Sequence, residues 1–159
     1  MPVHQPRPDQ SATNQSPTNQ SPTDQAGADG KILLIEDDET VREAISTLLE
    51  RAGYDVAEAE NGVVAAGMLE QWQPALVITD IFMPDSDGIE TLSLVRRRWP
   101  STPVIAISGG SPMLRLDYLR VADDLGAAAT VQKPFIADEF LALVRKVLAS
   151  GAPPAPVAP

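Results

Sequence analysis

Residues 76–84 read LVITDIFMP, an apolar run that is interrupted by the carboxylate of Asp80. A stretch as apolar as residues 75–79 is typical of a strand that is buried on both faces of a parallel sheet. A carboxylate at the end of such a strand has a high desolvation cost unless a partner stabilises it. We therefore interpret Asp80 as a functional residue at the end of a central strand.

Four other short apolar runs occur along the chain, and helical patterns separate them. They are residues 32–35, 54–57, 104–107 and 128–131. This alternation is the signature of a parallel sheet with helices on both faces. Asp55 indicates an edge position for the second run, whereas the first and fourth runs are almost wholly apolar and indicate central strands. The sequence therefore predicts an α/β fold with a doubly wound, five-stranded parallel sheet.

Between the runs, apolar residues recur at the 3.6-residue spacing of amphipathic helices. Helices are expected at about residues 41–52, 62–72, 89–99, 116–125 and 140–148. Gly53, Pro100 and Gly126 stand where the first, third and fourth of them would end, and Asn61 can cap the second. Each predicted helix thus has a local start or stop signal or a clear apolar stripe.

Two groups of charged residues are interpreted as structural. Asp38 lies just before the first predicted helix, where an acidic residue commonly caps the helix N-terminus. Arg96, Arg97 and Arg98 lie together near the end of the third helix. We interpret these three arginines as a solvated helix face.

The composition excludes several classes of function. The 159-residue chain has no Cys, and its one His is His4 near the N-terminus. Thiol nucleophiles, disulfide scaffolds and a Ser-His-Asp triad in the folded part are therefore excluded. The net charge is -10, and over residues 31–159 it is -8, from 11 Lys and Arg against 19 Asp and Glu. Such a balance repels nucleic acid and anionic membranes, so we expect binding to neither.

The two ends of the chain differ in composition from the middle. Residues 1–30 are rich in Gln, Ser, Pro and Thr and are expected to be a disordered tail, residues 31–149 form the domain, and residues 150–159 are an Ala/Pro-rich tail. Few residues follow the last predicted helix, so we expect a single-domain protein that acts by contact. No segment resembles a signal peptide or the ~20 apolar residues of a membrane helix, which predicts a cytoplasmic protein.

Nearly every candidate reactive side chain lies directly after a predicted strand. Glu36 and Asp37 follow the first strand, Asp80 the third, Ser108 the fourth and Lys133 the fifth. Ligands of open α/β sheets bind at the carboxyl ends of the strands, where the strand order changes direction. We therefore expect these five side chains to line one crevice.

Three carboxylates in one crevice need a positive partner, because like charges about 4 Å apart repel by about 4 kcal/mol at an effective dielectric of about 20. Mg²⁺ prefers oxygen ligands and is usually held by one or two carboxylates together with a phosphate oxygen. Lys133 and Ser108 could bind an incoming anion, and Asp80 could then attack phosphorus. The pattern predicts Mg²⁺-dependent transfer of a phosphoryl group to Asp80.

Four motifs at these positions resemble the receiver domains of two-component response regulators. They are ILLIEDDE at residues 32–39, LVITDIFMP at 76–84 with Asp87-Gly88, IAISG at 105–109, and KPF at 133–135. The resemblance covers about residues 30–149 and implies the flavodoxin-like strand order 2-1-3-4-5. It also implies a signalling phosphoacceptor, which assists its own phosphotransfer and dephosphorylation, and not an enzyme.

The resemblance implies a partner and a metal site. Asp80 would be phosphorylated by the phosphohistidine of a sensor histidine kinase or a histidine phosphotransfer protein. Mg²⁺ would be bound directly by Asp37 and Asp80, through water by Glu36, and by the backbone carbonyl of Phe82. Phosphorylation would then switch contacts with a downstream protein target, which the sequence does not identify.

The resemblance also implies how the phosphoryl group is held. Ser108, Gly109 and Lys133 would bind its oxygens, and the peptide bond between Lys133 and Pro134 would be cis. The chain departs from the family pattern at Thr130, where an aromatic switch residue is usual. Phe82 is bulky at a position that faces the phosphorylation site, so we hypothesise that it slows hydrolysis of the phosphorylated form.

Two other functions are considered. A pseudo-receiver would have the same fold and bind proteins without phosphorylation, but it would normally lack part of the acid, aspartate and lysine set that this chain keeps. A phosphatase of the haloacid-dehalogenase type would carry an Asp-x-Asp motif after its first strand, where this chain has Glu36, Asp37 and Asp38. A nucleotide-binding protein is disfavoured because the phosphate-loop and Gly-x-Gly-x-x-Gly motifs are absent.

Overall fold

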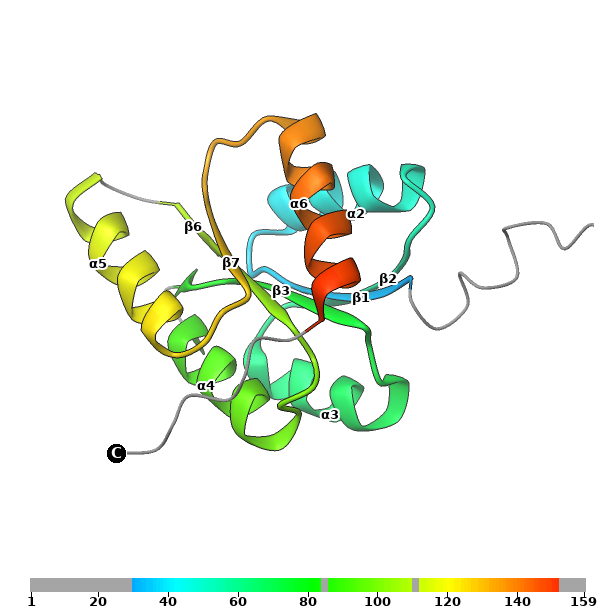
Figure 1. Cartoon of the computed structure of the whole chain (residues 1–159), viewed down its shortest axis with the longest axis horizontal. Coiled ribbons are helices and arrows are strands. Elements are labelled where there is room, and N and C mark those ends of the chain that lie inside the picture. The colour runs from blue at the N-terminus through cyan, green and yellow to red at the C-terminus, as the bar shows by residue number, and fades with distance from the viewer. Residues whose placement is uncertain (1–29, 84–85, 110–111, 152–159) are drawn as a thin grey trace, which may run out of the picture.

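The structure is a computed structural model that describes residues 30–83, 86–109 and 112–151 (Figure 1). In chain order the elements are β1 (Lys31–Ile35), α2 (Glu39–Arg51), β2 (Asp55–Ala59), α3 (Gly62–Trp72), β3 (Leu76–Asp80), β4 (Phe82–Met83), β5 (Ser86–Asp87), α4 (Gly88–Arg98), β6 (Val104–Ser108), α5 (Pro112–Asp124), β7 (Ala129–Gln132) and α6 (Ala137–Ser150). Most of the predicted tails, residues 1–29 and 152–159, lies outside the described residues. None of the described helices is long and apolar enough to span a membrane.

The main sheet has five strands in the order β2-β1-β3-β6-β7, and every pair in it is parallel. Because β6 and β7 are the fourth and fifth strands of this sheet, the predicted order 2-1-3-4-5 is confirmed. The edge position of β2 and the central positions of β1, β3 and β6 are confirmed as well. The order changes direction between β1 and β3, which lie side by side.

Helices cover both faces of the sheet (Figure 1). On one face, α3, α4 and α5 pack on alternate strand residues such as Leu33, Ile35 and Val77. On the other face, α2 and α6 pack on the intervening residues, such as Leu34 and Ile78. Since successive side chains of a strand point to opposite faces, central strands with both faces covered must be apolar throughout. This is why the run at residues 76–79 contains only Leu, Val, Ile and Thr.

The helix starts follow the predicted capping residues. The side chain of Asp38 accepts a hydrogen bond of 2.9 Å from the backbone N–H of Val41, at the start of α2. Asn61 accepts hydrogen bonds of 3.0 and 2.9 Å from Val63 and Val64, at the start of α3. Both interpretations are confirmed. Gly53, which follows α2, has a φ of 94°, a conformation that glycine adopts without steric strain.

Three details differ from the prediction. Strand β2 pairs with β1 from Asp55 to Ala59, so it lies one to two residues later than residues 54–57. Helix α5 begins at Pro112 and not near residue 116. The antiparallel hairpin of β4 and β5 was not predicted, because strands of two residues are too short to leave a periodic pattern.

The interpretation of three solvated arginines is wrong for Arg96. Its side chain is buried, with a residue exposure of 5%, and one guanidinium nitrogen donates a hydrogen bond of 2.8 Å to the carbonyl of Pro100. Arg96 lies one residue after Val95 and four after Leu92, so helical geometry places it on the buried stripe of α4. Arg97 and Arg98 are exposed, as predicted.

Candidate phosphoryl-acceptor and metal site

The carboxyl ends of β1, β3, β6 and β7 bring the predicted residues to one edge of the sheet. Glu36 follows β1 and is buried, Asp37 is exposed, and Asp80 is the buried last residue of β3. The pairing of β1 with β3 sets Ile35 beside Thr79, so the residues that follow them are neighbours. Figure 1 shows these strand ends converging on one side of the molecule.

Lys133 joins the two buried carboxylates across the crevice. Its Nζ lies 2.6 Å from Oε2 of Glu36 and 2.7 Å from Oδ2 of Asp80, and it donates a hydrogen bond to each. The side chains of the two acids are only 3% and 6% exposed. Charge-assisted contacts of this length are strong in a poorly hydrated crevice. The ammonium therefore stabilises two negative charges that would otherwise be buried side by side.

The other oxygen of Asp80 is held by the backbone. Its Oδ1 accepts a hydrogen bond of 2.8 Å from the N–H of Phe82, while the N–H of Ile81 donates to the carbonyl of Ile107 at 2.9 Å. The chain is thus fixed to β6 immediately after the acid. Two different contacts restrain the two oxygens of Asp80, which gives the carboxylate one orientation.

Glu36, Asp37 and Asp80 form the acidic cluster that could hold a metal ion. One oxygen of each carboxylate lies within 4.8 Å of the others. Ligands at opposite corners of a Mg²⁺ octahedron are about 4.2 Å apart, since each bond is about 2.1 Å. Neighbouring ligands of the octahedron are only about 3.0 Å apart, so a site in which all three acids bind Mg²⁺ directly requires their oxygens to move closer together, and otherwise a water stands between the ion and one acid. The all-oxygen donor set fits Mg²⁺ and does not fit a soft metal.

The surroundings of the crevice shift the pKa values of Glu36 and Lys133. Burial raises the pKa of Glu36 to about 7 from its ordinary 4.5; Lys133 lowers it in part, and the charge of Asp80 raises it. Burial lowers the pKa of Lys133, but the hydrogen bonds and charges of Asp80 and Glu36 more than offset this, so the pKa lies above its ordinary 10.5. Lys133 is therefore fully charged near neutral pH, and Glu36 is poised between its two protonation states.

The remaining predicted residues lie on the β6–β7 side of the crevice. Ser108 is buried; its Oγ donates to the carbonyl of Gly109 at 3.3 Å, and its own carbonyl accepts a hydrogen bond of 2.8 Å from the N–H of Lys133. Gly109 lies against the side chain of Lys133. The bond between Lys133 and Pro134 is cis, as predicted. Thr130 is half-buried in β7, paired with Ala106.

Arg42 supports the site but was missed by the sequence reasoning, and Gly88 was named only as part of a motif, without a structural role. Arg42, in the first turns of α2, donates a hydrogen bond of 2.8 Å to the backbone carbonyl of Glu36 and forms an ion pair of 3.3 Å with Glu58. Gly88 begins α4 directly against β3, where a Cβ would overlap the carbonyl of Asp80 and the Cα of Ile81. Gly88 stands in the Asp87-Gly88 motif, whereas Arg42 left no signal in the sequence beyond its charge.

Comparison with known proteins decides the family. The sequence model of the response regulator receiver domain matches residues 32–145. The chain belongs to the response regulator receiver family. The resemblance stated from the motifs is confirmed, and with it the role of a phosphoacceptor in two-component signalling. Receivers bind Mg²⁺ at an acidic pocket and interact with histidine kinases or phosphotransfer proteins, and Glu36, Asp37 and Asp80 form such a pocket in this receiver.

Individual relatives agree with this assignment. The receiver is 37% identical to the transcriptional regulatory protein CpxR homolog of Haemophilus influenzae over 78% of this chain and 52% of that protein. It is 31% identical to protein PilG of Pseudomonas aeruginosa over 77% of this chain and 90% of PilG. The receiver domain of NtrX from Brucella abortus has a similar structure, with a TM-score of 0.71 and 26% identity over 75% of this chain and 98% of that domain. The chain spans about half the length of most curated relatives that it matches.

Proposed function

We propose that the carboxylate of Asp80 accepts a phosphoryl group from a phosphohistidine, in a reaction that requires Mg²⁺. An Asp80 oxygen forms a bond to phosphorus as the bond from phosphorus to the imidazole nitrogen breaks, and the imidazole leaves. The observation that carries the proposal is the contact of Lys133 with both Glu36 and Asp80, next to the exposed carboxylate of Asp37. The crevice thus has a nucleophile in contact with a fixed cation, beside a cluster of carboxylates that could bind a metal ion.

The residues of the crevice would have different roles in the reaction. Asp37, Asp80 and the carbonyl of Phe82 would bind Mg²⁺, with Glu36 acting through water, and the ion would neutralise charge on the transferred group. Lys133 would turn from the carboxylates toward the incoming phosphoryl oxygens, which Ser108 and Gly109 would also contact. The backbone N–H of Phe82 holds Asp80 in place during the attack. Lys133, which now stabilises Asp80, would thus have a second role once the phosphoryl group arrives.

A groove beside the crevice supports a protein as the phosphoryl donor. It has a volume of about 380 Å³ and lies between α2 and the start of the β7–α6 connection. Its lining is mainly apolar: Val41, Ala44 and Leu48 from α2 on one side and Pro134 and Phe135 on the other. Lys133 stands at the end of this groove and touches Asp80. A helix of the donor that occupies the groove would therefore hold its phosphohistidine within reach of Asp80.

The output of the switch is proposed to be contact with a protein target. The charge of -8 over residues 31–159 opposes direct contact with nucleic acid. The match to PilG, which spans 90% of that relative, supports an output that proceeds through contacts of this domain itself.

Phosphoramidate is a suitable test reagent, because its phosphorus–nitrogen bond mimics phosphohistidine. Incubation with phosphoramidate and Mg²⁺ should add the mass of one phosphoryl group to the wild type and none to Asp80→Asn. An unmodified wild type would favour the pseudo-receiver, whose role is binding alone. Rapid, repeated turnover of a phosphoester such as p-nitrophenyl phosphate would favour the phosphatase.

A further inference from the structure

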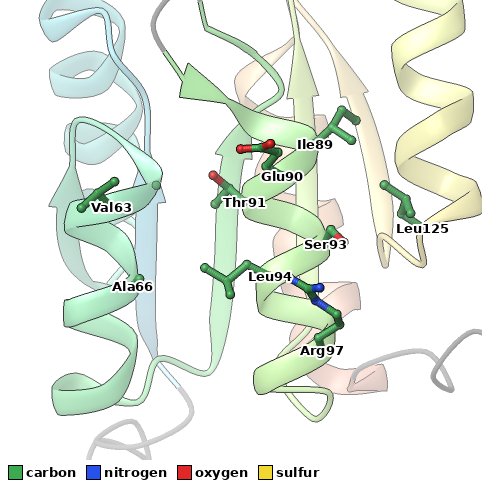
Figure 2. A pocket seen from close by; sticks show the side chains of 10 residues that line it. Val63, Ala66, Ile89, Glu90, Thr91, Ser93, Leu94, Arg97 and Leu125 are labelled. Carbon is green, nitrogen blue, oxygen red and sulfur yellow. The ribbon is translucent and has the colours of Figure 1, made fainter.

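The outer face of α3 and α4 has a hollow that the phosphoryl chemistry does not use. Its volume is about 700 Å³, and its lining includes Val63 and Ala66 from α3 and Glu90, Leu94 and Arg97 from α4 (Figure 2). Val63 is 86% exposed, the highest value among the large apolar side chains that the structure describes. A hollow bordered by an apolar side chain this exposed is a candidate surface for another macromolecule.

Two opposite charges stand at the two ends of this face of α4. Glu90 and Arg97 are seven residues apart, which corresponds to about 10.5 Å along the helix and nearly the same angular position. Neither forms an ion pair with another residue of the described ranges, whereas the next arginine, Arg98, pairs with Glu70 at 2.6 Å. The face therefore presents an exposed acid and an exposed base, with Ser93 and Leu94 between them.

This arrangement of charges on α4 is complementary to the same surface of a second copy. In a dimer with two-fold symmetry the same surface of both copies meets, so that residue i contacts residue j and j contacts i. If α4 packs antiparallel to α4 of a second copy, with the axis between positions 93 and 94, Glu90 of each copy lies opposite Arg97 of the other. One exposed acid and one exposed base thus give two intermolecular ion pairs, and Leu94 meets Leu94 at the centre.

The neighbouring helix obeys the same symmetry. Gly62 of α3 lies against Thr91 of α4, and the two helices run side by side in the same direction (Figures 1 and 2). Positions 62 and 91 thus lie at the same level along the two parallel helices. The two-fold axis therefore places Val63 opposite Ala66 of the second copy. The small side chain of Ala66 leaves space for the exposed valine. The same antiparallel arrangement therefore satisfies both the apolar contacts and the ion pairs.

We infer that the face formed by Val63, Ala66, Glu90, Leu94 and Arg97 is a homodimer interface, with α4 packed antiparallel on α4 of a second copy. The interface is small and both copies carry a net charge of the same sign, so the dimer is weak, with a Kd in the micromolar range or above. The inference does not depend on phosphorylation of Asp80. It can therefore fail or succeed separately from the proposed function.

Exchange of the two charges tests this arrangement directly. Sedimentation equilibrium of the full chain measures the dimer Kd of each variant. Glu90→Arg places two arginines together twice per dimer, and Arg97→Glu does the same with two glutamates, so each should raise the dimer Kd at least tenfold. The double variant Glu90→Arg/Arg97→Glu restores both pairs with the charges exchanged and should return the Kd to within about threefold of the wild type. Glu43→Arg on α2 makes the same change of net charge on another face and should not weaken the dimer.

Disulfide trapping gives a second measurement. The chain has no Cys, so Ser93→Cys introduces its only thiol. At an interaxial distance of about 9 Å, the two Ser93 Cα atoms would be about 6 Å apart, which a disulfide can span. Mild oxidation should cross-link Ser93→Cys efficiently and the control Ser150→Cys, at the end of α6, poorly. A wild type that stays monomeric up to about 1 mM, single charge reversals without effect, a double variant that stays dissociated, or equal cross-linking of the two cysteine variants would each overturn the inference.

Discussion

The ammonium of Lys133 lies 2.7 Å from the carboxylate of Asp80, although 53 residues separate the two in the chain. The same ammonium lies 2.6 Å from Glu36, so one cation stabilises two acids in a crevice where both are almost fully buried. A second cation in the crevice would stabilise the two acids in place of Lys133, so that the ammonium could contact another group. In the proposed mechanism, metal binding, the position of Lys133 and phosphoryl acceptance are therefore linked in one small set of contacts.

Replacement of Lys133 should make stability depend on Mg²⁺. In Lys133→Met the buried acids lose their partner, which should lower the free energy of unfolding by about 2–3 kcal/mol in the presence of EDTA. Millimolar Mg²⁺ should recover much of this loss, since the ion supplies the missing positive charge. Urea denaturation with EDTA and with Mg²⁺ measures both effects. Lys146→Met, on the exposed side of α6, is the control, and an equal Mg²⁺ response in all three proteins would contradict the prediction.

Binding of Mg²⁺ should weaken as the pH falls through 7. Burial raises the pKa of Glu36 to about 7, so its proton competes with the metal below that pH. At pH 6 only about one tenth of Glu36 would be ionised, and the Kd for Mg²⁺ should be up to about tenfold higher than at pH 8. Calorimetric titration at the two pH values measures this difference. Glu36→Gln should show a much smaller pH dependence, and a dependence as steep as in the wild type would point to another group.

The same raised pKa has a consequence for the metal-free protein. The folded state keeps the proton of Glu36 up to about pH 7, whereas the unfolded chain loses it near 4.5. Between these values the folded state binds more protons, so the contribution of Glu36 to stability decreases as the pH rises from 4.5 to 7. Urea denaturation in EDTA should show this fall in the wild type relative to Glu36→Gln. A difference between the two proteins that is constant across the range would contradict it.

Gly88 should tolerate no side chain. A Cβ at this position would overlap the backbone of Asp80 and Ile81, so Gly88→Ala should lower the free energy of unfolding by about 1–3 kcal/mol and slow phosphorylation. Gly67→Ala is the matched control, because Gly67 lies in a helix and a Cβ there would meet only open space. It should raise stability by up to about 1 kcal/mol. Equal effects of the two substitutions in urea denaturation would show that close packing at Gly88 is not the cause.

Phe82 should control how long the phosphorylated form lasts. Its side chain is 42% exposed, two residues after Asp80, where it can obstruct the water that attacks phosphorus. If Asp80 is phosphorylated as proposed, Phe82→Asn should shorten the lifetime of the phosphorylated protein several-fold, and Phe82→Leu should change it little. The loss of phosphoryl mass with time after removal of the donor measures the lifetime. An unchanged lifetime in Phe82→Asn would remove this role from Phe82.

Most of the fold could be predicted because it rests on patterns of period 2 and 3.6. The strand ends at Asp80, Ser108 and Lys133 followed from apolar runs, and the parallel sheet then placed them at one edge. The position of Arg96 could not be predicted from its charge, since only the register of α4 shows that it faces inward. The close approach of Gly88 to β3 could not be predicted either, because it depends on the height at which α4 crosses the sheet.

The residues that form the site could be predicted more readily than the contacts between them. The sequence indicates that acids and a lysine meet, but it does not indicate that Lys133 bridges Glu36 and Asp80 and leaves Asp37 exposed. Nor does it show that Arg42 fixes the carbonyl of Glu36. These choices depend on side-chain burial and on distances of a few tenths of an ångström. They are properties of packing, which a one-dimensional pattern does not contain.

The most direct test of the proposed chemistry is to locate the phosphoryl group. The protein is treated with phosphoramidate, with Mg²⁺ or with EDTA, and the phosphorylated peptide is identified by tandem mass spectrometry after borohydride reduction of the acyl phosphate. We expect one modified residue, Asp80, and modification only when Mg²⁺ is present. Modification at another residue, or equal modification of Asp80 in EDTA, would contradict the proposed mechanism.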